Sequence, residues 1–171
     1  TRPVGAIFHH QGNPGFQYFE SSDQRERAEL ERAFPGRTVY PASASADGRK
    51  LLVLAASAND PGAYYRVDLD TREIREIGKV APWLDPARLA RVTALRVKSE
   101  DDIEIDAFLA QPPGIERPPL LVLPHGGPVG VMDARDFSRE VQFLAERGMA
   151  VLQVNYRGSE GYGKTFMQAG H

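Results

Sequence analysis

Residues 119–128 read Pro-Leu-Leu-Val-Leu-Pro-His-Gly-Gly-Pro, and residues 150–163 read Ala-Val-Leu-Gln-Val-Asn-Tyr-Arg-Gly-Ser-Glu-Gly-Tyr-Gly. Each stretch begins as a short apolar run and ends in a glycine-rich polar turn, as a buried strand and its following loop do. The segment between them has apolar residues at helical spacing. This order of strand, loop, helix, strand and loop predicts the start of a parallel α/β sheet. Ligands bind at the carboxyl ends of strands in such sheets, so residues 124–130 and 155–163 are the candidate functional loops.

The elements around these loops follow from the same patterns. Residues 120–123 and 150–154 are apolar enough to predict strands buried on both faces. Residues 137–147 are expected to form a helix, with Asp136 as its N-cap and Gly148 as its stop. Alternating residues upstream predict two more strands, at 92–97 and 103–110.

The first 80 residues have a different pattern, that of short antiparallel strands. Four strands are expected at 38–41, 50–58, 63–69 and 73–77, separated by turns rich in Gly, Asp and Asn. Before them we expect a strand at 4–10, a turn at 13–15, a strand at 16–19 and a helix at 23–34 with a capping box of Asp23 and Glu26. Four strands at this spacing are typical of a β-propeller blade, and a meander in another antiparallel sheet has the same spacing.

Composition limits the classes of function. The 171 residues are 42% hydrophobic and carry a net charge of −2, which allows a core and gives no basic face for nucleic acid. There is no cysteine, which excludes disulfides and cysteine-ligated metals, and we expect no metal and no cofactor. No apolar run approaches the roughly 18 residues of a membrane span, and no signal peptide is recognisable, so we expect no membrane partner and a cytoplasmic location. The chain starts at Thr1 and ends just after a strand and loop, so we expect a fragment of a longer protein.

The motif His125-Gly126-Gly127-Pro128 comes directly after the first predicted buried strand. Hydrolases of the α/β class take one oxyanion-hole N–H from a loop in this position, because a fixed N–H stabilises the negative charge of a tetrahedral intermediate. Glycine lets the backbone approach closely and adopt φ values that other residues avoid. A tight exit turn with a hydrogen-bonded core histidine would explain the same residues, so both interpretations stay open here.

The second loop also fits a phosphate-binding pattern. Residues 158–165 match G-x-x-x-x-G-K-[ST], in which Lys164 would reach phosphates and Thr165 would hold magnesium. Asn155-Tyr156-Arg157 separates the strand from this loop, and Glu160 places a carboxylate inside the presumed anion site. A glycine-rich loop with a chance Lys-Thr pair is the commoner explanation.

Three blocks taken together resemble a known family. Residues 124–128, 140–148 and 154–163, which read Pro-His-Gly-Gly-Pro, Glu-Val-Gln-Phe-Leu-Ala-Glu-Arg-Gly and Val-Asn-Tyr-Arg-Gly-Ser-Glu-Gly-Tyr-Gly, resemble the prolyl oligopeptidase family of serine peptidases. The nearest branch looks like the acylaminoacyl-peptidase or dipeptidyl-peptidase-like enzymes. The resemblance implies a mixed β and α/β fold, in which residues 1–80 are the C-terminal blades of a β-propeller and residues 81–171 are the N-terminal part of an α/β-hydrolase domain.

The resemblance also implies a function, the hydrolysis of short peptides by acyl transfer. His125, Gly126 and Gly127 would form the oxyanion-hole loop, with the N–H of Gly127 as the donor. The second loop would support the substrate site through Tyr156, Arg157, Gly158 and Tyr162. The family's catalytic Ser, Asp and His all follow this loop, so none lies in this chain, and the isolated chain is expected to be inactive. A P-loop nucleotide-binding protein and a non-catalytic binding module remain the alternatives.

An incomplete hydrolase sheet would leave apolar strand faces uncovered. The strands at 120–123 and 150–154 would then lack neighbours. We therefore expect the isolated fragment to self-associate.

Overall fold

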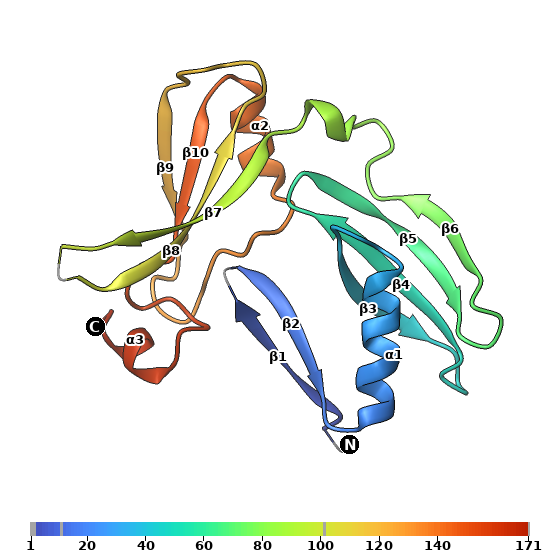
Figure 1. Ribbon diagram of the computed structural model, residues 1–171. Helices are drawn as coiled ribbons and strands as arrows, with labels where there is room; N and C mark the ends of the chain where they lie inside the picture. The colour runs from blue at the N-terminus through green and yellow to red at the C-terminus, as the bar shows by residue number, and fades with distance from the viewer. Residues whose placement is uncertain (1–2, 11, 101, 171) are drawn as a thin grey trace.

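The computed structural model of the chain describes residues 3–10, 12–100 and 102–170 and contains three sheets (Figure 1). The strands are β1 (Gly5–His10), β2 (Asn13–Tyr18), β3 (Thr38–Ala44), β4 (Lys50–Ser57), β5 (Asp60–Asp68), β6 (Ile74–Lys79), β7 (Arg91–Lys98), β8 (Glu104–Gln111), β9 (Leu120–Pro124) and β10 (Ala150–Val154). The helices are α1 (Ser21–Arg32), the 3-10 helix η1 (Pro86–Arg88), α2 (Arg139–Glu146) and α3 (Lys164–Gln168).

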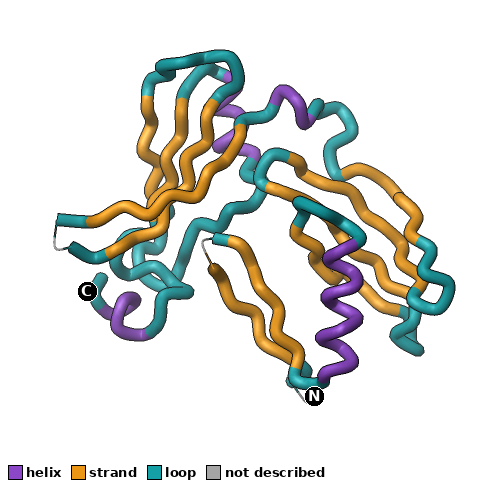
Figure 2. Tube along the Cα trace, viewed as in Figure 1, coloured by secondary structure: helices purple, strands orange, loops and turns teal. Residues whose placement is uncertain are grey.

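The four strands expected in the first half form one antiparallel sheet in the order β3-β4-β5-β6. Helix α1 packs on this sheet, and the hairpin of β1 and β2 lies beside the helix (Figures 1 and 2). The core between helix and sheet consists of apolar side chains that are less than a tenth exposed: Leu30, Phe34, Val39, Val53, Ala55 and Val67. The alternation of apolar residues along the strands therefore places one face of the sheet against the helix, as the sequence predicts.

Arg27 joins the hairpin, the helix and the sheet. Its side chain is 3% exposed, and its guanidinium donates to Val39 O at 2.7 Å and pairs with Glu31 at 2.7 Å. The same guanidinium lies 3.9 Å from the centre of the Phe16 ring on β2. Burying a charge is costly unless it is paired and hydrogen-bonded, and here the carboxylate, the carbonyl and the aromatic face compensate it.

The second half forms a mixed sheet in the order β7-β8-β10-β9. Strands β9 and β10 run parallel, with Ala150 opposite Leu120 and Val154 opposite Pro124. Helix α2 makes the connection between them and packs on one face, where Val141 and Ala145 are buried. The predicted strand, helix and strand are confirmed, and both candidate loops leave the sheet at the same edge, because they follow parallel strands in register.

Strand β9 differs from the expectation of a strand buried on both faces. It pairs only with β10 among the described strands, and Leu120 and Val122 are 58% and 57% exposed. Strand β10 is hydrogen-bonded on both sides, to β8 and to β9, so the expectation that it lacks neighbours is wrong. An all-apolar run does not distinguish an edge strand from a central one, since both have the same residues.

Two predicted helix starts and one predicted turn are also wrong. Asn13 and Pro14 lie inside β2, not in a turn. Helix α1 begins at Ser21 with no side-chain cap, so Asp23 lies in its first turn and forms no capping box with Glu26. Helix α2 is capped by Ser138, whose hydroxyl accepts from Val141 N. The predicted cap, Asp136, accepts a hydrogen bond from Tyr40 at 2.5 Å, so a long-range contact takes the carboxylate away from the helix end.

Hydrogen bonds between described residues connect the mixed sheet and its loops with the preceding elements. Gln142 on α2, which is 5% exposed, donates to Ala58 O at 3.2 Å. Arg135 N donates to Gly12 O at 2.8 Å, and the third bond is the one between Tyr40 and Asp136. Residue 80, between β6 and η1, remains our predicted domain boundary.

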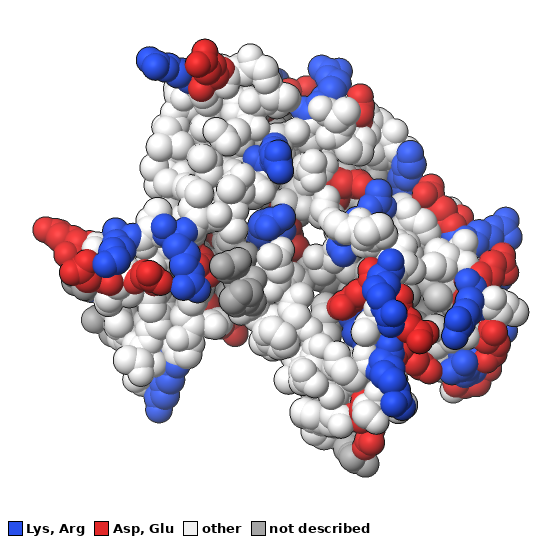
Figure 3. Space-filling model, viewed as in Figure 1, with Lys and Arg blue, Asp and Glu red and all other residues white. Residues whose placement is uncertain are grey.

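Charged side chains of both signs are interleaved over α1, β5 and β6, on the right of Figure 3. Several of them pair with each other, as Arg49 does with Glu26 and Arg66 with Glu73. Fewer charges lie over β9 and β10 in the same view. No helix of the described residues is both long and apolar enough to cross a membrane.

Candidate functional site

The two candidate loops meet at His125 and Tyr156. Their rings stack with centroids 4.5 Å apart and an angle of 18° between the planes. The Tyr156 hydroxyl also donates to the backbone oxygen of His125 at 2.7 Å. Both the side chain and the backbone of His125 are therefore held by a residue that is 31 positions away in the sequence.

Ser159 forms the next contact between the loops. Its side chain is fully buried, and its hydroxyl lies 2.8 Å from Nε2 of His125 and 2.6 Å from Tyr156 O. The other ring nitrogen, Nδ1, lies 3.0 Å from Gly126 O. His125 is thus surrounded by polar partners from both loops. We did not single out Ser159 from the sequence, because a serine in a glycine-rich loop is ordinarily a turn residue.

Gly126 and Gly127 lie at the exposed end of this arrangement. Both glycines are exposed, and no heavy atom lies within 4 Å of a Cβ built on Gly126. Gly127 has a φ of 137°, which side-chain-bearing residues rarely adopt. Within the part of the chain that the structure describes, no hydrogen bond uses the N–H of either glycine. The predicted oxyanion donor therefore lies at the surface, and no described residue accepts a hydrogen bond from its N–H.

Gly158 holds the C-terminal end of the first loop, at Gly130. Its carbonyl accepts from Gly130 N at 3.0 Å, and its own N–H donates to Phe166 O at 3.0 Å. The φ of Gly158 is 102°, and a Cβ there would lie 3.2 Å from the Cα of Gly170. Glycine is thus required at position 158 by both conformation and space, which explains its place in the motif without direct contact with a ligand.

Asn155 forms a buried clamp at the end of β10. Its side-chain oxygen accepts from Asp133 N at 2.8 Å, and its side-chain nitrogen donates to Asp133 O at 2.9 Å. That nitrogen also contacts the hydroxyl of Tyr162 at 2.9 Å, and the hydroxyl donates to Asp106 at 3.1 Å. Tyr162 therefore contacts Asn155 and Asp106, and its role in a substrate site stays a prediction. Asn155 and Asp133 were not among the predicted site residues.

Burial changes the ionisation of two groups in this network. It raises the pKa of Tyr162 to about 12, opposed by the hydrogen bond from Asn155 and assisted by the Asp106 carboxylate. Burial also raises the pKa of Asp133 above its ordinary value. One oxygen of Asp133 accepts from Gln153, and the other is buried with no hydrogen-bond partner among the described residues.

We predict that Tyr162→Phe lowers the free energy of unfolding of the chain by about 1–3 kcal/mol, since it removes a hydroxyl shared by a buried amide and a carboxylate. The phenol's contribution is fully present below its ordinary pKa of 10.0 and is lost as the pH rises through about 12. The difference between wild type and variant should therefore shrink in that range. Denaturant unfolding at several pH values measures it. Tyr64→Phe on β5, with an exposed side chain, is the control, and equal stability of the two variants would contradict the assignment.

The phosphate-binding alternative is unsupported by this geometry. The N–H groups of Gly158, Ser159 and Glu160 donate to carbonyl oxygens of Phe166, Tyr156 and Val131, each at 3.0 Å. A P-loop needs such N–H groups free to surround phosphate oxygens. Lys164 is exposed and begins α3, a helix of only five residues.

Arg157, the fourth predicted support residue, lies between two residues that contact the first loop. Its side chain is exposed, although both its neighbours in the sequence contact the first loop. Among residues 3–10, 12–100 and 102–170, no group of three or more His, Asp or Glu side chains is arranged to hold a metal ion.

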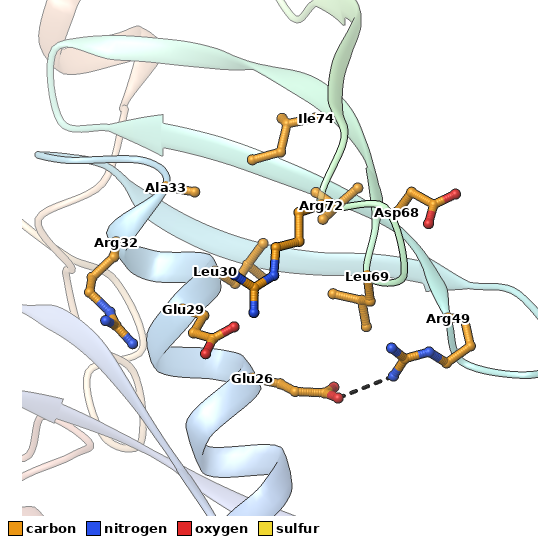
Figure 4. A pocket seen from close by; sticks show the side chains of 11 residues that line it. Glu26, Glu29, Leu30, Arg32, Ala33, Arg49, Asp68, Leu69, Arg72 and Ile74 are labelled. Atoms are coloured by element: carbon orange, nitrogen blue, oxygen red, sulfur yellow. Dashed lines mark hydrogen bonds and ion pairs between the residues drawn. The ribbon is translucent and has the colours of Figure 1, made fainter.

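A separate cleft of about 510 Å³ lies between α1 and the turn that joins β5 to β6 (Figure 4). Leu30 and Leu69 line it, and its rim carries charges of both signs. Glu26 and Arg49 on that rim pair with each other at 3.2 Å, so part of the rim charge is neutralised. The cleft is the groove between a helix and a sheet, and it does not include the candidate loops.

Comparison with known sequences points to one family. The profile of the prolyl oligopeptidase family matches residues 135–171, which include α2, β10 and the second loop. Dipeptidyl aminopeptidase BIII from Pseudoxanthomonas mexicana is 31% identical, over 87% of this chain and 23% of that protein. The acylamino-acid-releasing enzyme of Mus musculus is 39% identical over 37% of this chain and 9% of its own length.

Solved structures give a similar result. An acylaminoacyl peptidase from Pyrococcus horikoshii is 30% identical, covers 75% of this chain and superposes with a TM-score of 0.56. A prolyl endopeptidase structure covers 80% of this chain with a TM-score of 0.63 at 21% identity, which is a likeness of fold. The chain spans about a fifth of each of these two structures and 23% of the dipeptidyl aminopeptidase. The sequence comparison and the mixed β and α/β fold thus indicate the same family.

Proposed function

Since this chain belongs to the prolyl oligopeptidase family, we propose that it supplies the oxyanion-hole loop of a serine peptidase that hydrolyses short peptides. One observation carries the proposal: Gly127 is exposed just after β9, and its N–H has no hydrogen-bond partner among the described residues. This loop is held at His125 and at Gly130 by the second loop. An oxyanion donor needs both availability and a fixed direction, and the two features together meet that need.

The chemistry that follows is acyl transfer. A serine hydroxyl attacks the carbonyl carbon of the scissile peptide bond, and its proton passes to a histidine. The carbonyl oxygen then becomes an oxyanion, and the N–H of Gly127 donates a hydrogen bond to it. The histidine returns the proton to the leaving amine as the tetrahedral intermediate collapses. In this proposal the catalytic serine, aspartate and histidine belong to sequence that follows residue 171, and Gly127 acts with the N–H of the residue after the serine.

The proposed substrates are short peptides. The names of two relatives, a dipeptidyl aminopeptidase and an acylamino-acid-releasing enzyme, describe removal of one or two residues from a peptide end. The sheet of β3 to β6 would belong to a propeller that admits only small substrates to the site. Residues 1–80 would then control access, and residues 81–171 would contribute to the chemistry.

The test compares the isolated chain with the full-length product of its gene. We expect the full-length protein to cleave aminoacyl or acylaminoacyl chromogenic substrates and to be labelled covalently by a fluorophosphonate, which reacts with activated serines. The isolated 171 residues should do neither. A full-length protein that is neither active nor labelled would contradict the peptidase proposal. Activity of the isolated chain would contradict the proposed division of the site.

A further inference from the structure

Ser159 occupies an unusual position for a loop serine. It is fully buried, and its single hydroxyl proton has one short acceptor, Tyr156 O at 2.6 Å. A hydroxyl that donates to a carbonyl has only lone pairs left for its other partner. The contact of 2.8 Å with Nε2 of His125 is the second polar contact of this hydroxyl, and Nδ1 on the other side of the ring lies 3.0 Å from Gly126 O. Both ring nitrogens of His125 are therefore in contact with polar atoms of the two loops.

The ring of His125 has no rotational freedom left in this arrangement. Ser159 fixes its Nε2 edge, and the parallel ring of Tyr156 covers one face at 4.5 Å. The Tyr156 hydroxyl holds the backbone oxygen of the same residue at 2.7 Å. The chain then leads into Gly126, whose oxygen lies 3.0 Å from Nδ1 of the same ring, and from there into Gly127.

The direction of the Gly127 N–H therefore depends on the two held residues that flank the glycine pair along the chain, His125 and Gly130. On one side is His125, held by Ser159 and Tyr156. On the other side is Gly130, whose N–H donates to Gly158 O at 3.0 Å. A pair of exposed glycines between two fixed points takes its orientation from those points, because glycine itself permits a wide range of backbone angles.

We propose that Ser159 is a positioning residue, which orients the oxyanion-hole glycines by fixing the imidazole ring of His125. This inference rests on the proposed peptidase function. Ser159 touches neither the substrate nor the catalytic serine in this scheme. Its hydroxyl acts through His125, and the quantity that it controls is the alignment of the Gly127 N–H with the oxyanion of the transition state.

The expected signature is a loss in kcat with little change in KM. An aligned donor stabilises the transition state more than the bound substrate, so misalignment lowers kcat and kcat/KM together. In the full-length protein, Ser159→Ala should lower kcat by about 10-fold to 100-fold, less than the 10²–10³ expected for complete loss of a donor. Tyr156→Phe, which keeps the ring stack and loses the bond to His125 O, should lower kcat in the same way.

A control variant separates positioning from general destabilisation. Ser138→Ala removes the N-cap hydroxyl of α2, another part-buried serine in the same half of the chain, whose bond goes to Val141 N. It should lower the unfolding midpoint and leave kcat unchanged. A double-mutant cycle of Ser159→Ala and His125→Leu gives a second measurement. Ser159→Ala should have no further effect on kcat in the His125→Leu background, because the imidazole is already absent.

The outcomes are distinguishable. A wild-type protein without activity and without fluorophosphonate labelling overturns the peptidase proposal itself. An active wild type whose kcat is unchanged by Ser159→Ala overturns only the positioning role. Equal loss of kcat from Ser159→Ala in the presence and absence of His125 also overturns it, because the serine would then act by another route.

Discussion

Gly127→Ala in the full-length protein should lower kcat/KM by about 10²–10³, the effect of removing one oxyanion donor. The φ of Gly127 is 137°, and a methyl group there would lie 3.1 Å from Val131 Cγ2 and 3.3 Å from Val129 N. The backbone must therefore rotate to accept alanine, and the N–H turns with it. Steady-state kinetics on an aminoacyl chromogenic substrate measures the loss, which should appear mainly in kcat.

Gly114→Ala is the matched control for this substitution. Gly114 also has a positive φ, 76°, and no atom lies within 4 Å of its added Cβ. It lies in the loop between β8 and β9, away from the contacts of His125. The control should lose a comparable amount of stability through backbone strain and keep its activity. If Gly127→Ala retains wild-type kcat/KM, the N–H of Gly127 is not an oxyanion donor.

Phe108→Ala should lower the free energy of unfolding of the chain by about 3–5 kcal/mol, as other buried phenylalanine truncations do. Phe108 on β8 is 1% exposed. Its ring fills the space beside Gly12, where an added Cβ would lie 2.3 Å from the ring. Removal of the ring leaves a cavity between the mixed sheet and the hairpin of β1 and β2. Urea unfolding followed by far-ultraviolet circular dichroism measures the change.

Phe143→Ala on α2 is the comparison for this prediction. The Phe143 side chain is 54% exposed, so its truncation leaves no internal cavity. It should lower the free energy of unfolding far less than Phe108→Ala does. Arg147, whose guanidinium lies 4.9 Å from the Phe143 ring, would lose a weak contact at the surface. Similar losses for the two phenylalanines would show that the ring of Phe108 is not packed as described.

Local patterns predicted the elements whose residues contact near neighbours in the sequence. The strands β9 and β10 and the helix between them follow from apolar spacing, because α2 packs its apolar face on the sheet that it connects. The caps were predicted less well. Asp136 has the right residue type for an N-cap, but it bonds to Tyr40, which is 96 positions away. No local pattern carries that information.

The residues of the candidate site also fall into those that local sequence patterns predict and those that depend on long-range contacts. The positions of His125, Gly126 and Gly127 follow from a motif placed after an apolar strand, and in the structure the motif directly follows β9. The contributions of Ser159, Asn155 and Asp133 depend on how two loops fold against each other, which spacing along the chain does not specify. For Asn155 the sequence offers one indication, its position directly after the apolar run 150–154. In the structure this run is β10, which is paired on both sides.

The hydrogen bond from Gln142 to Ala58 has a consequence for large-scale motion. Together with the bonds from Arg135 to Gly12 and from Tyr40 to Asp136, it crosses between the sheet that carries the glycine loop and the elements before it. If the predicted boundary near residue 80 acts as a hinge, opening it would break these bonds, and the amide of Gln142 would then need new partners. We therefore expect these bonds to oppose relative motion of the mixed sheet and the elements that precede it.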